Sequence, residues 1–470
     1  MDDNSVVIKS ILQKKTKNKL FETDWLASNP IFYNLKDRLA STKIHDVFSN
    51  NSDLNFHPEG LSNFLDFGYS VFSQTPIQNV NFLPPSSRLF RHDDTNITIE
   101  QMSDPVEKWM SYTLSEDDII ELIKERVQNW EASLPSNQEI ILPLSGGFDS
   151  RLLLWCIKDK SRVRAFTYGL SKQQDQSLEV VHAKKLAKHF KLRWEQIYLE
   201  KFHSYFDDWD KEFGISVHAH GMYHLEFYNK IRENLKGEHA FLSGIFGDVW
   251  AGTVLPIEMN NEKDLINLSF SHGLCANSKF LKLPEQNQLK KNFFMDNKEK
   301  LYDYRFQVIT TIRLKIILIS YLMRVPSLFN FKPWTPYLDI DIAMAMLNLP
   351  KERRKNRQWQ VDFFKKVGLD LENQNLKTDR KNSLNFQSMK KQKVPPLNTE
   401  LLSQLFEKRY IEWINKNVYV TPWRELCYNS LDMPKIGRVL RRLGVKNTTL
   451  ESYYAYLCLK PIEKILESKR

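Results

Sequence analysis

The sequence predicts an α/β fold built on a parallel sheet, with a small β-rich region before this sheet and a mostly helical region after it. Three apolar segments, 140–144, 163–170 and 194–199, follow one another with helical patterns between them. A strand-helix-strand-helix-strand order at this spacing is typical of a parallel sheet with helices on both faces. Ligands of such sheets bind beyond the carboxyl ends of the strands. The residues that follow each predicted strand are therefore the first candidates for a functional site.

Length, charge and cysteine content are those of an ordinary globular protein. A chain of 470 residues can form two or three domains with substantial cores. The net charge of +10 is dispersed along the chain, so it predicts a solvated basic surface, and nucleic acid is not an expected partner. Four widely separated cysteines (Cys156, Cys275, Cys427 and Cys458) contain no metal-type pair and favour reduced thiols.

The sequence contains no segment that we expect to cross a membrane. The most apolar long segment, 308–331, is interrupted by Arg313, Lys315 and Arg324. Charges at these positions are costly at the centre of a bilayer, so this segment predicts a buried helix, and no membrane partner is expected. The start of the chain lacks a basic stretch followed by an apolar core. No secretory signal is therefore expected, and cytoplasmic localisation is predicted.

The most informative stretch is the turn between the strand 140–144 and the next helix, which reads Leu-Ser-Gly-Gly-Phe-Asp-Ser. Two adjacent glycines let the backbone turn sharply and approach a ligand closely, and the start of a helix favours an anion. Hydroxyl groups can donate to phosphate, and Asp149 can help to hold a magnesium ion that bridges phosphates. The spacing is that of neither a Walker loop nor a dinucleotide fingerprint. The turn therefore predicts a pyrophosphate cradle made of Leu144, Ser145, Gly146, Gly147, Asp149 and Ser150.

A second glycine turn of this kind follows the predicted strand 240–242. It places Ser243, Gly244 and Asp248 beyond the carboxyl end of that strand. Tyr168 lies near the end of the strand segment 163–170. Because the carboxyl ends of parallel strands meet at one edge of a sheet, we expect both turns to grip the same triphosphate.

The first turn resembles the Ser-Gly-Gly-x-Asp-Ser loop of PP-loop ATP pyrophosphatases, and the two turns together resemble the asparagine synthetases of that class. The resemblance implies that Ser243 and Gly244 contact the nucleotide and that Asp149 and Asp248 bind Mg²⁺ and the pyrophosphate of ATP. The second signature of the family, Ser-Gly-Glu-Gly-x-Asp-Glu, departs here at Ile245, because isoleucine can neither accept a proton nor orient an amine. This substitution puts asparagine as the product in doubt.

A third resemblance lies at 336–339 and 343–350, which are similar to the Pro-Phe-Leu-Asp segment of the family and the helix after it. The family then places a lysine that stabilises the leaving pyrophosphate. The nearest basic residues here are Lys355 and Arg357, and we favour Arg357, because a cation that faces a phosphoryl leaving group is physically sensible. The predicted catalytic residues are Asp149, Asp248 and Arg357.

The first quarter of the chain bears a separate resemblance. Segments 23–33 and 58–85 resemble the later half of a class II glutamine amidotransferase domain. That class uses a cysteine at the mature N-terminus as its nucleophile, whereas position 2 here is Asp2. We therefore predict an amidotransferase-like remnant over 1–112 that cannot hydrolyse glutamine, followed by an ATP pyrophosphatase domain over 113–470.

The resemblance implies an amide-forming ligase that uses ATP and Mg²⁺ to activate a small-molecule or peptide carboxylate as an acyl-adenylate, which an amine then attacks. Free ammonia, a separate glutaminase or an amine on the substrate itself would supply the nitrogen. Two alternatives stay open: an intramolecular amide former of the β-lactam or lasso-peptide type, and a nucleotide-binding scaffold that has lost catalysis. A tRNA-modifying PP-loop enzyme is a weaker rival, since such enzymes place the loop near their start and commonly add an RNA-binding tail. Binding to RNA that weakens steeply with salt would favour this rival.

Overall fold

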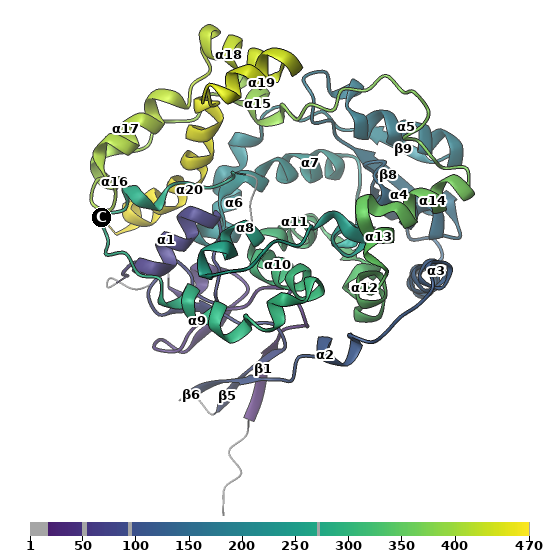
Figure 1. Cartoon of the computed structure of the whole chain (residues 1–470), viewed down its shortest axis with the longest axis horizontal. Coiled ribbons are helices and arrows are strands. Elements are labelled where there is room, and N and C mark those ends of the chain that lie inside the picture. The colour runs from purple at the N-terminus through teal and green to yellow at the C-terminus, as the bar shows by residue number, and fades with distance from the viewer. Residues whose placement is uncertain (1–16, 49–53, 93–95, 270–272, 470) are drawn as a thin grey trace, which may run out of the picture.

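The computed structural model describes residues 17–48, 54–92, 96–269 and 273–469 (Figure 1). Residues 1–16 of the predicted remnant, which include Asp2, lie outside the described residues.

The centre of the fold is a five-stranded parallel sheet in the order β11-β10-β7-β8-β9, and it confirms the predicted fold class. Its strands are β7 (Ile140–Pro143), β8 (Val163–Thr167), β9 (Arg193–Gln196), β10 (His239–Leu242) and β11 (Phe331–Trp334). The chain runs outward from β7 to β9 and then returns to β10 on the other side of β7. The strand order therefore reverses between β7 and β10, and this is where ligands bind in open α/β sheets.

The helices that the sequence predicts around this sheet are present. They are α3 (Glu116–Ser133), α4 (Phe148–Cys156), α5 (Leu178–Phe190) and α7 (Met222–Glu233). The hydroxyl of Ser115 caps α3 by accepting a hydrogen bond from the backbone N–H of Asp118 at 3.1 Å. Leu152, Leu153 and Leu154 are fully buried, which fixes α4 in the core directly behind the first glycine turn.

Strand β11 lies in the part of the chain that the sequence indicated only as mostly helical. It has four residues, and one of them is Pro333. Proline has no N–H for a ladder, and it is tolerated here because β11 lies at the edge of the sheet and pairs only with β10. Trp334 stacks on Trp130 of α3 with ring centroids 4.9 Å apart. A strand this short leaves too few residues for an alternating pattern to be read.

The N-terminal region is small and β-rich, as predicted. One three-stranded antiparallel sheet contains β1 (Lys17–Glu22), β5 (Ser87–His92) and β6 (Asn96–Gln101), and the other contains β3 (Leu39–Ser41), β2 (Phe32–Asn34) and β4 (Val80–Phe82). The helix α1 (Pro58–Phe67) was not foreseen. Its signals are in the sequence, since proline suits the first helical position and Gly68 takes the left-handed conformation after the last, with φ of 82°.

The second half of the chain is mainly helical, as predicted. The helices of at least eight residues are α9 (Gln288–Asn297), α10 (Tyr304–Ile319), α11 (Tyr321–Leu328), α12 (Ile340–Leu347), α14 (Gln358–Lys366), α15 (Leu384–Lys391), α17 (Lys408–Asn417), α18 (Pro422–Asp432), α19 (Pro434–Arg442) and α20 (Thr448–Ser468). The apolar segment 308–331 contains most of α10, all of α11 and the first residue of β11, and much of it is buried. None of the helices in the described ranges is both long and apolar enough to cross a membrane.

The N-terminal region is joined to the rest by polar contacts as well as by a continuous apolar core. Arg313 of α10 donates to both carboxylate oxygens of Asp104, at 2.6 and 2.9 Å, and to the backbone carbonyl of Trp25 at 2.7 Å. The indole of Trp25 in turn donates to the carbonyl of Leu338 at 2.9 Å. Because the core runs across residue 112, the boundary between 112 and 113 stays a prediction.

Replacing Arg313 tests how strongly this junction holds the fold. We expect Arg313→Met to lower the free energy of unfolding by about 2 kcal/mol, because it leaves Asp104 and a partly buried carbonyl without their donor. Lys366→Met is the matched control, since its ion pair with Asp117 is exposed on both sides, and it should cost less than about 0.5 kcal/mol. Urea unfolding followed by circular dichroism measures both values. Equal effects of the two substitutions would contradict a structural role for the Arg313 contacts.

Candidate functional site

The two glycine turns meet at the point where the strand order reverses. A Cβ atom on Gly244 would lie 3.2 Å from the Cβ of Asp149, and one on Gly247 would lie only 2.7 Å from the Oδ1 atom of Asp149. The second turn therefore packs directly on the first acidic residue, as the sequence led us to expect. Gly247 was not predicted as a site residue, because its role depends on this contact between distant segments.

The first turn is shaped by its glycines and hydroxyls. Gly146 has φ of +70°, and a Cβ there would lie 2.3 Å from the Cβ of His182 in α5, so no other residue fits. Gly147 is the N-cap of α4, and Asp149 lies in the first turn of that helix. The hydroxyl of Ser145 accepts from the N–H of Gly147 and lies 3.3 Å from the hydroxyl of Ser150. Two hydroxyls and a helix N-terminus thus converge on one place, which favours an anion.

Arg151 holds this turn in place from behind, a role that its position in the sequence did not indicate. Its side chain is fully buried. It donates to the carbonyl of Gly146 at 2.6 Å, to the carbonyl of Leu369 at 2.9 Å and to both carboxylate oxygens of Glu372, at 2.7 and 2.9 Å. Burial opposes ionisation of Glu372, but the hydrogen bonds and charge of Arg151 leave the pKa of that carboxyl below its ordinary value.

The second turn leads from β10 into the helical turn Val249–Thr253. The hydroxyl of Ser243 accepts from the N–H of Ile245 at 3.2 Å. Phe246 has φ of +70°, which is rare for a residue with a bulky side chain and marks a strained position. The carboxylate of Asp248 accepts from the hydroxyl of Thr253 at 3.2 Å. This turn therefore has its own fixed shape before it meets Asp149.

Arg357 reaches Asp149 from a third segment. Its guanidinium donates to the Oδ1 atom of Asp149 and lies over the ring of Phe148. Asn356 and Arg357 both have left-handed backbone, with φ of 52° and 57°. The segment that contains Arg354 and Arg357 packs closely against Gly252, which has φ of 123° and no side chain. A Cβ at Gly252 would lie 2.1 Å from the carbonyl oxygen of Arg354.

The electrostatics of the site centre on Asp149. Burial and the charge of Asp248 raise the pKa of this carboxyl, Arg357 opposes both effects, and the net result is a pKa of about 6. A second cation, Lys315 of α10, lies close enough for the charge of Asp248 to favour its protonated form, although burial lowers the pKa of Lys315 overall. In the sequence, Lys315 is visible only as an interruption of an apolar segment. The site thus combines two carboxylates and two cations.

A cavity of about 350 Å³ opens between the two turns. Seven of the predicted residues line it: Leu144, Ser145, Asp149, Ser150, Tyr168, Ser243 and Gly244. Four predicted residues do not line the cavity: Gly146, Gly147, Asp248 and Arg357. Arg357 is connected to the cavity by its hydrogen bond to Asp149, which does line it. Apolar side chains also line the cavity, among them those of Phe166, Phe241 and Ile245. A polar edge beside an apolar wall suits a ligand with a flat apolar part and an anionic part.

His224 of α7 is a further lining residue that the sequence did not indicate. Its Nε2 atom lies 3.2 Å from the hydroxyl of Tyr168. Burial lowers the pKa of His224 to about 3, so this imidazole stays neutral near pH 7. A single histidine within a helical pattern gives no local signal of such a contact.

The donor set fits magnesium bound together with phosphate. Across the described ranges no cluster of three or more His, Cys, Asp or Glu side chains could hold a metal ion alone. Mg²⁺, however, commonly takes one or two carboxylates and completes its shell with water and substrate phosphates. The repulsion between the charges of Asp149 and Asp248, which contributes to the raised pKa of Asp149, is what a bridging cation would relieve.

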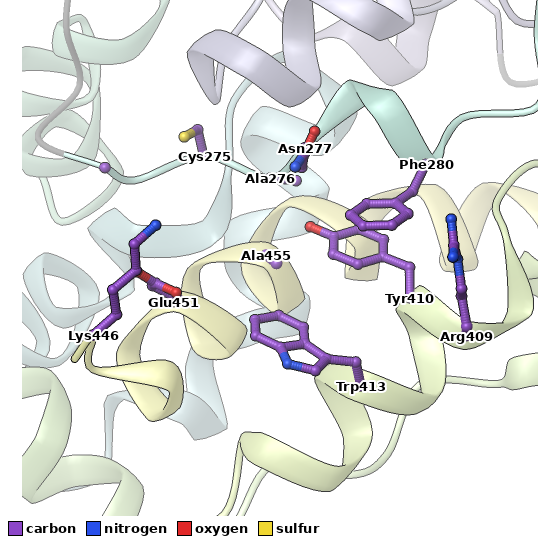
Figure 2. Close-up of a pocket in the computed structure, with 11 residues that line it drawn as sticks. Cys275, Ala276, Asn277, Phe280, Arg409, Tyr410, Trp413, Lys446, Glu451 and Ala455 are labelled. Atoms are coloured by element: carbon purple, nitrogen blue, oxygen red, sulfur yellow. The ribbon is translucent and has the colours of Figure 1, made fainter. Parts of the chain in front are cut away.

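A larger cavity, of about 800 Å³, lies between α17, α20 and the segment 273–280 (Figure 2). Phe280 and Tyr410 stand on one side of it, with ring centroids 4.2 Å apart, and Lys446 and Glu451 stand on the other. None of the predicted site residues lines it. The smaller cavity is therefore the candidate active site, since it alone of the two contains the glycine turns and Asp149.

Comparison with known proteins gives a family match over part of the chain. No curated protein matches the sequence. The match to a protein family covers residues 129–238, from within α3 to the residue before β10. It includes the first glycine turn and Tyr168 and ends before the second turn and Arg357. Over these residues the chain matches the asparagine synthase family.

Proposed function

We propose that this protein is an ATP-dependent amide-forming ligase that activates a carboxylate as an acyl-adenylate. The observation that carries the proposal is that the second glycine turn and Arg357 both contact Asp149 of the first turn. These contacts lie beside a cavity, at the place where the strand order of the parallel sheet reverses. The asparagine synthase match over 129–238 supports the same class of reaction. Within this proposal, residues 113–470 form the synthetase domain and 1–112 an amidotransferase-like remnant without glutaminase activity.

Each group of the site has a role in this reaction. The N-terminus of α4 with the hydroxyls of Ser145 and Ser150 binds phosphate oxygens, while Ser243 and Gly244 contact the nucleotide. A magnesium ion held by Asp149 and Asp248 would neutralise phosphate charge when bound. Arg357 stabilises the negative charge that develops on the leaving pyrophosphate. The apolar wall of the cavity receives the adenine ring.

The proposed chemistry has two steps. A carboxylate oxygen of the substrate bonds to the α-phosphorus of ATP while the bond from this phosphorus to the bridging oxygen breaks, and pyrophosphate leaves. An amine then attacks the acyl carbon, loses a proton and expels AMP, which gives the amide. Ammonia, a separate glutaminase or an amine on the substrate supplies the nitrogen. The substrate is a small molecule or a peptide, and asparagine is not proposed as the product, because Ile245 lines the cavity where the family has glutamate.

An intramolecular amide former is the second candidate, and the apolar Ile245 in the cavity favours it, since a tethered amine needs no separate group to recruit it. Dependence on ammonia separates the two candidates. The ligase needs an added amine to release AMP and amide, whereas the cyclase does not. A scaffold without catalysis would bind ATP and release no pyrophosphate with any substrate.

The first prediction concerns the two carboxylates. We expect Asp149→Asn and Asp248→Asn each to reduce ATP–pyrophosphate exchange at least about 100-fold, since each change removes a carboxylate that would hold the magnesium ion that neutralises phosphate charge. Exchange is measured across a panel of aspartate, uronic acids and peptides. Asp117→Asn, at an exposed position of α3, should leave exchange unchanged. Exchange that survives both site substitutions would refute the assignment.

The second prediction concerns pH. Asp149 must be ionised to hold a cation, and burial raises its pKa to about 6. Exchange at subsaturating Mg²⁺ should therefore fall as the pH decreases through about 6 and reach a plateau above pH 7. The circular dichroism spectrum should stay constant over the same range, which separates titration of the site from unfolding. A flat exchange profile between pH 5 and 8 would show that Asp149 does not control the reaction.

A further inference from the structure

Helices α18 and α19 form a hairpin at the rim of the molecule (Figure 1) whose apolar side chains are unusually exposed. Of the fourteen large apolar side chains that are exposed in the described residues, seven lie between 423 and 445. They are Trp423, Leu426, Met433, Ile436, Val439, Leu443 and Val445. Scattered single apolar residues are normal on a surface, whereas a cluster indicates an interaction site.

The exposed apolar face of α19 follows from how this helix packs. Ile436, Val439 and Leu443 recur at helical spacing on one side. The helix approaches α18 through Gly437, where a Cβ would lie 1.9 Å from the carbonyl oxygen of Leu431. Because the glycine makes the contact, the apolar stripe is left in solvent, with Leu443 74% exposed.

Helix α18 exposes apolar side chains on its own outer side. It is held to the protein by Tyr428, whose ring stacks on that of Phe386 at 3.9 Å, and by the buried Leu431. Trp423 and Leu426 lie on another face of the helix, and Trp423 is 71% exposed. The hairpin is therefore anchored on one side and apolar on the other.

Positive charge surrounds this apolar surface. Lys435, Arg438, Arg441, Arg442 and Lys446 are all exposed. In the part of the chain that the structure describes, none of these five cations forms an ion pair, unlike the cations of many other helices. Their charge is thus available to a negatively charged partner.

We propose that the α18–α19 hairpin binds the surface of an anionic lipid bilayer. Amphipathic helices with Trp, Leu and Ile on one face and Lys and Arg on the other lie in the interface of such membranes, where basic residues are attracted to anionic headgroups. Tryptophan side chains are also enriched at the interface between membrane and water. An apolar surface spread over two projecting helices suits a flat boundary. A second copy of this chain is disfavoured, since a two-fold contact would set the five cations against the same five cations.

This proposal is independent of the reaction proposed above. No membrane partner was expected from the sequence, because it contains no segment that would span a membrane. A hairpin that binds at the membrane surface needs no such segment. Bound in this way, the protein would act at a membrane surface.

Sedimentation of the full-length protein with vesicles tests the proposal. We expect at least tenfold more binding to vesicles rich in phosphatidylglycerol than to phosphatidylcholine vesicles, and weaker binding in 500 mM NaCl than in 100 mM, since salt screens the headgroup attraction. Two variants separate the two contributions. The quadruple change of Lys435, Arg438, Arg441 and Arg442 to Gln, and the triple change of Trp423, Ile436 and Leu443 to Ser, should each reduce binding at least tenfold.

A matched control removes four exposed lysines elsewhere, with Lys172, Lys184, Lys185 and Lys188 changed to Gln, and it should bind vesicles nearly as the wild type does. Circular dichroism and gel filtration verify that each variant is folded. The proposal is overturned if the wild type ignores anionic vesicles, or if both hairpin variants bind them as well as the control does. A dimer that the triple variant loses, without vesicle binding by the wild type, would assign the face to a second copy instead.

Discussion

The structure of the site depends on one interaction. The carboxylate of Asp149, whose side chain is 17% exposed, accepts a hydrogen bond from the guanidinium of Arg357, and two glycines of another turn pack against Asp149. Burial of a charge is unfavourable unless a partner compensates it. Even with Arg357 present, the pKa of Asp149 is raised to about 6. The fold thus holds a carboxylate that is only partly compensated, which is a suitable state for a group whose further partner is a cation brought in with phosphate.

This arrangement requires close approach of three chain segments, and missing side chains make that approach possible. Gly247 contacts Asp149, and Gly146 contacts α5. Gly252 allows the segment that precedes Arg357 to pack closely against it. A rigid support is needed behind them, because a turn rich in glycine is flexible by itself. Arg151 provides it with bonds to the turn, to Leu369 and to Glu372. One buried cation thus orders the turn that would bind the anion.

How much of this could be read from the sequence depended on distance along the chain. The strand, glycine turn and helix around Asp149 are contiguous in the sequence, so their pattern could be recognised there. The second turn shows a similar order of strand, glycine turn and acidic residue. The ion pair between Asp149 and Arg357 joins residues 208 positions apart and was not predicted. The family resemblance indicated only that Arg357 would face the leaving pyrophosphate. Lys315 and His224 carried no local signal, because their positions in the site result from the packing of α10 and α7. The functional roles of all these residues stay predictions.

The family match ends before β10, so it covers the first glycine turn and leaves out Asp248, Ile245 and Arg357. These two parts face different physical demands. Binding of a triphosphate needs fixed N–H groups, hydroxyls and charges, which are the same for every acyl substrate. Choice of the acid and the amine depends on the shape and polarity of the wall beyond the phosphates, and there Ile245 offers only apolar surface. Under the proposed function, the half of the site that binds ATP can therefore be kept while the other half accepts a different nucleophile.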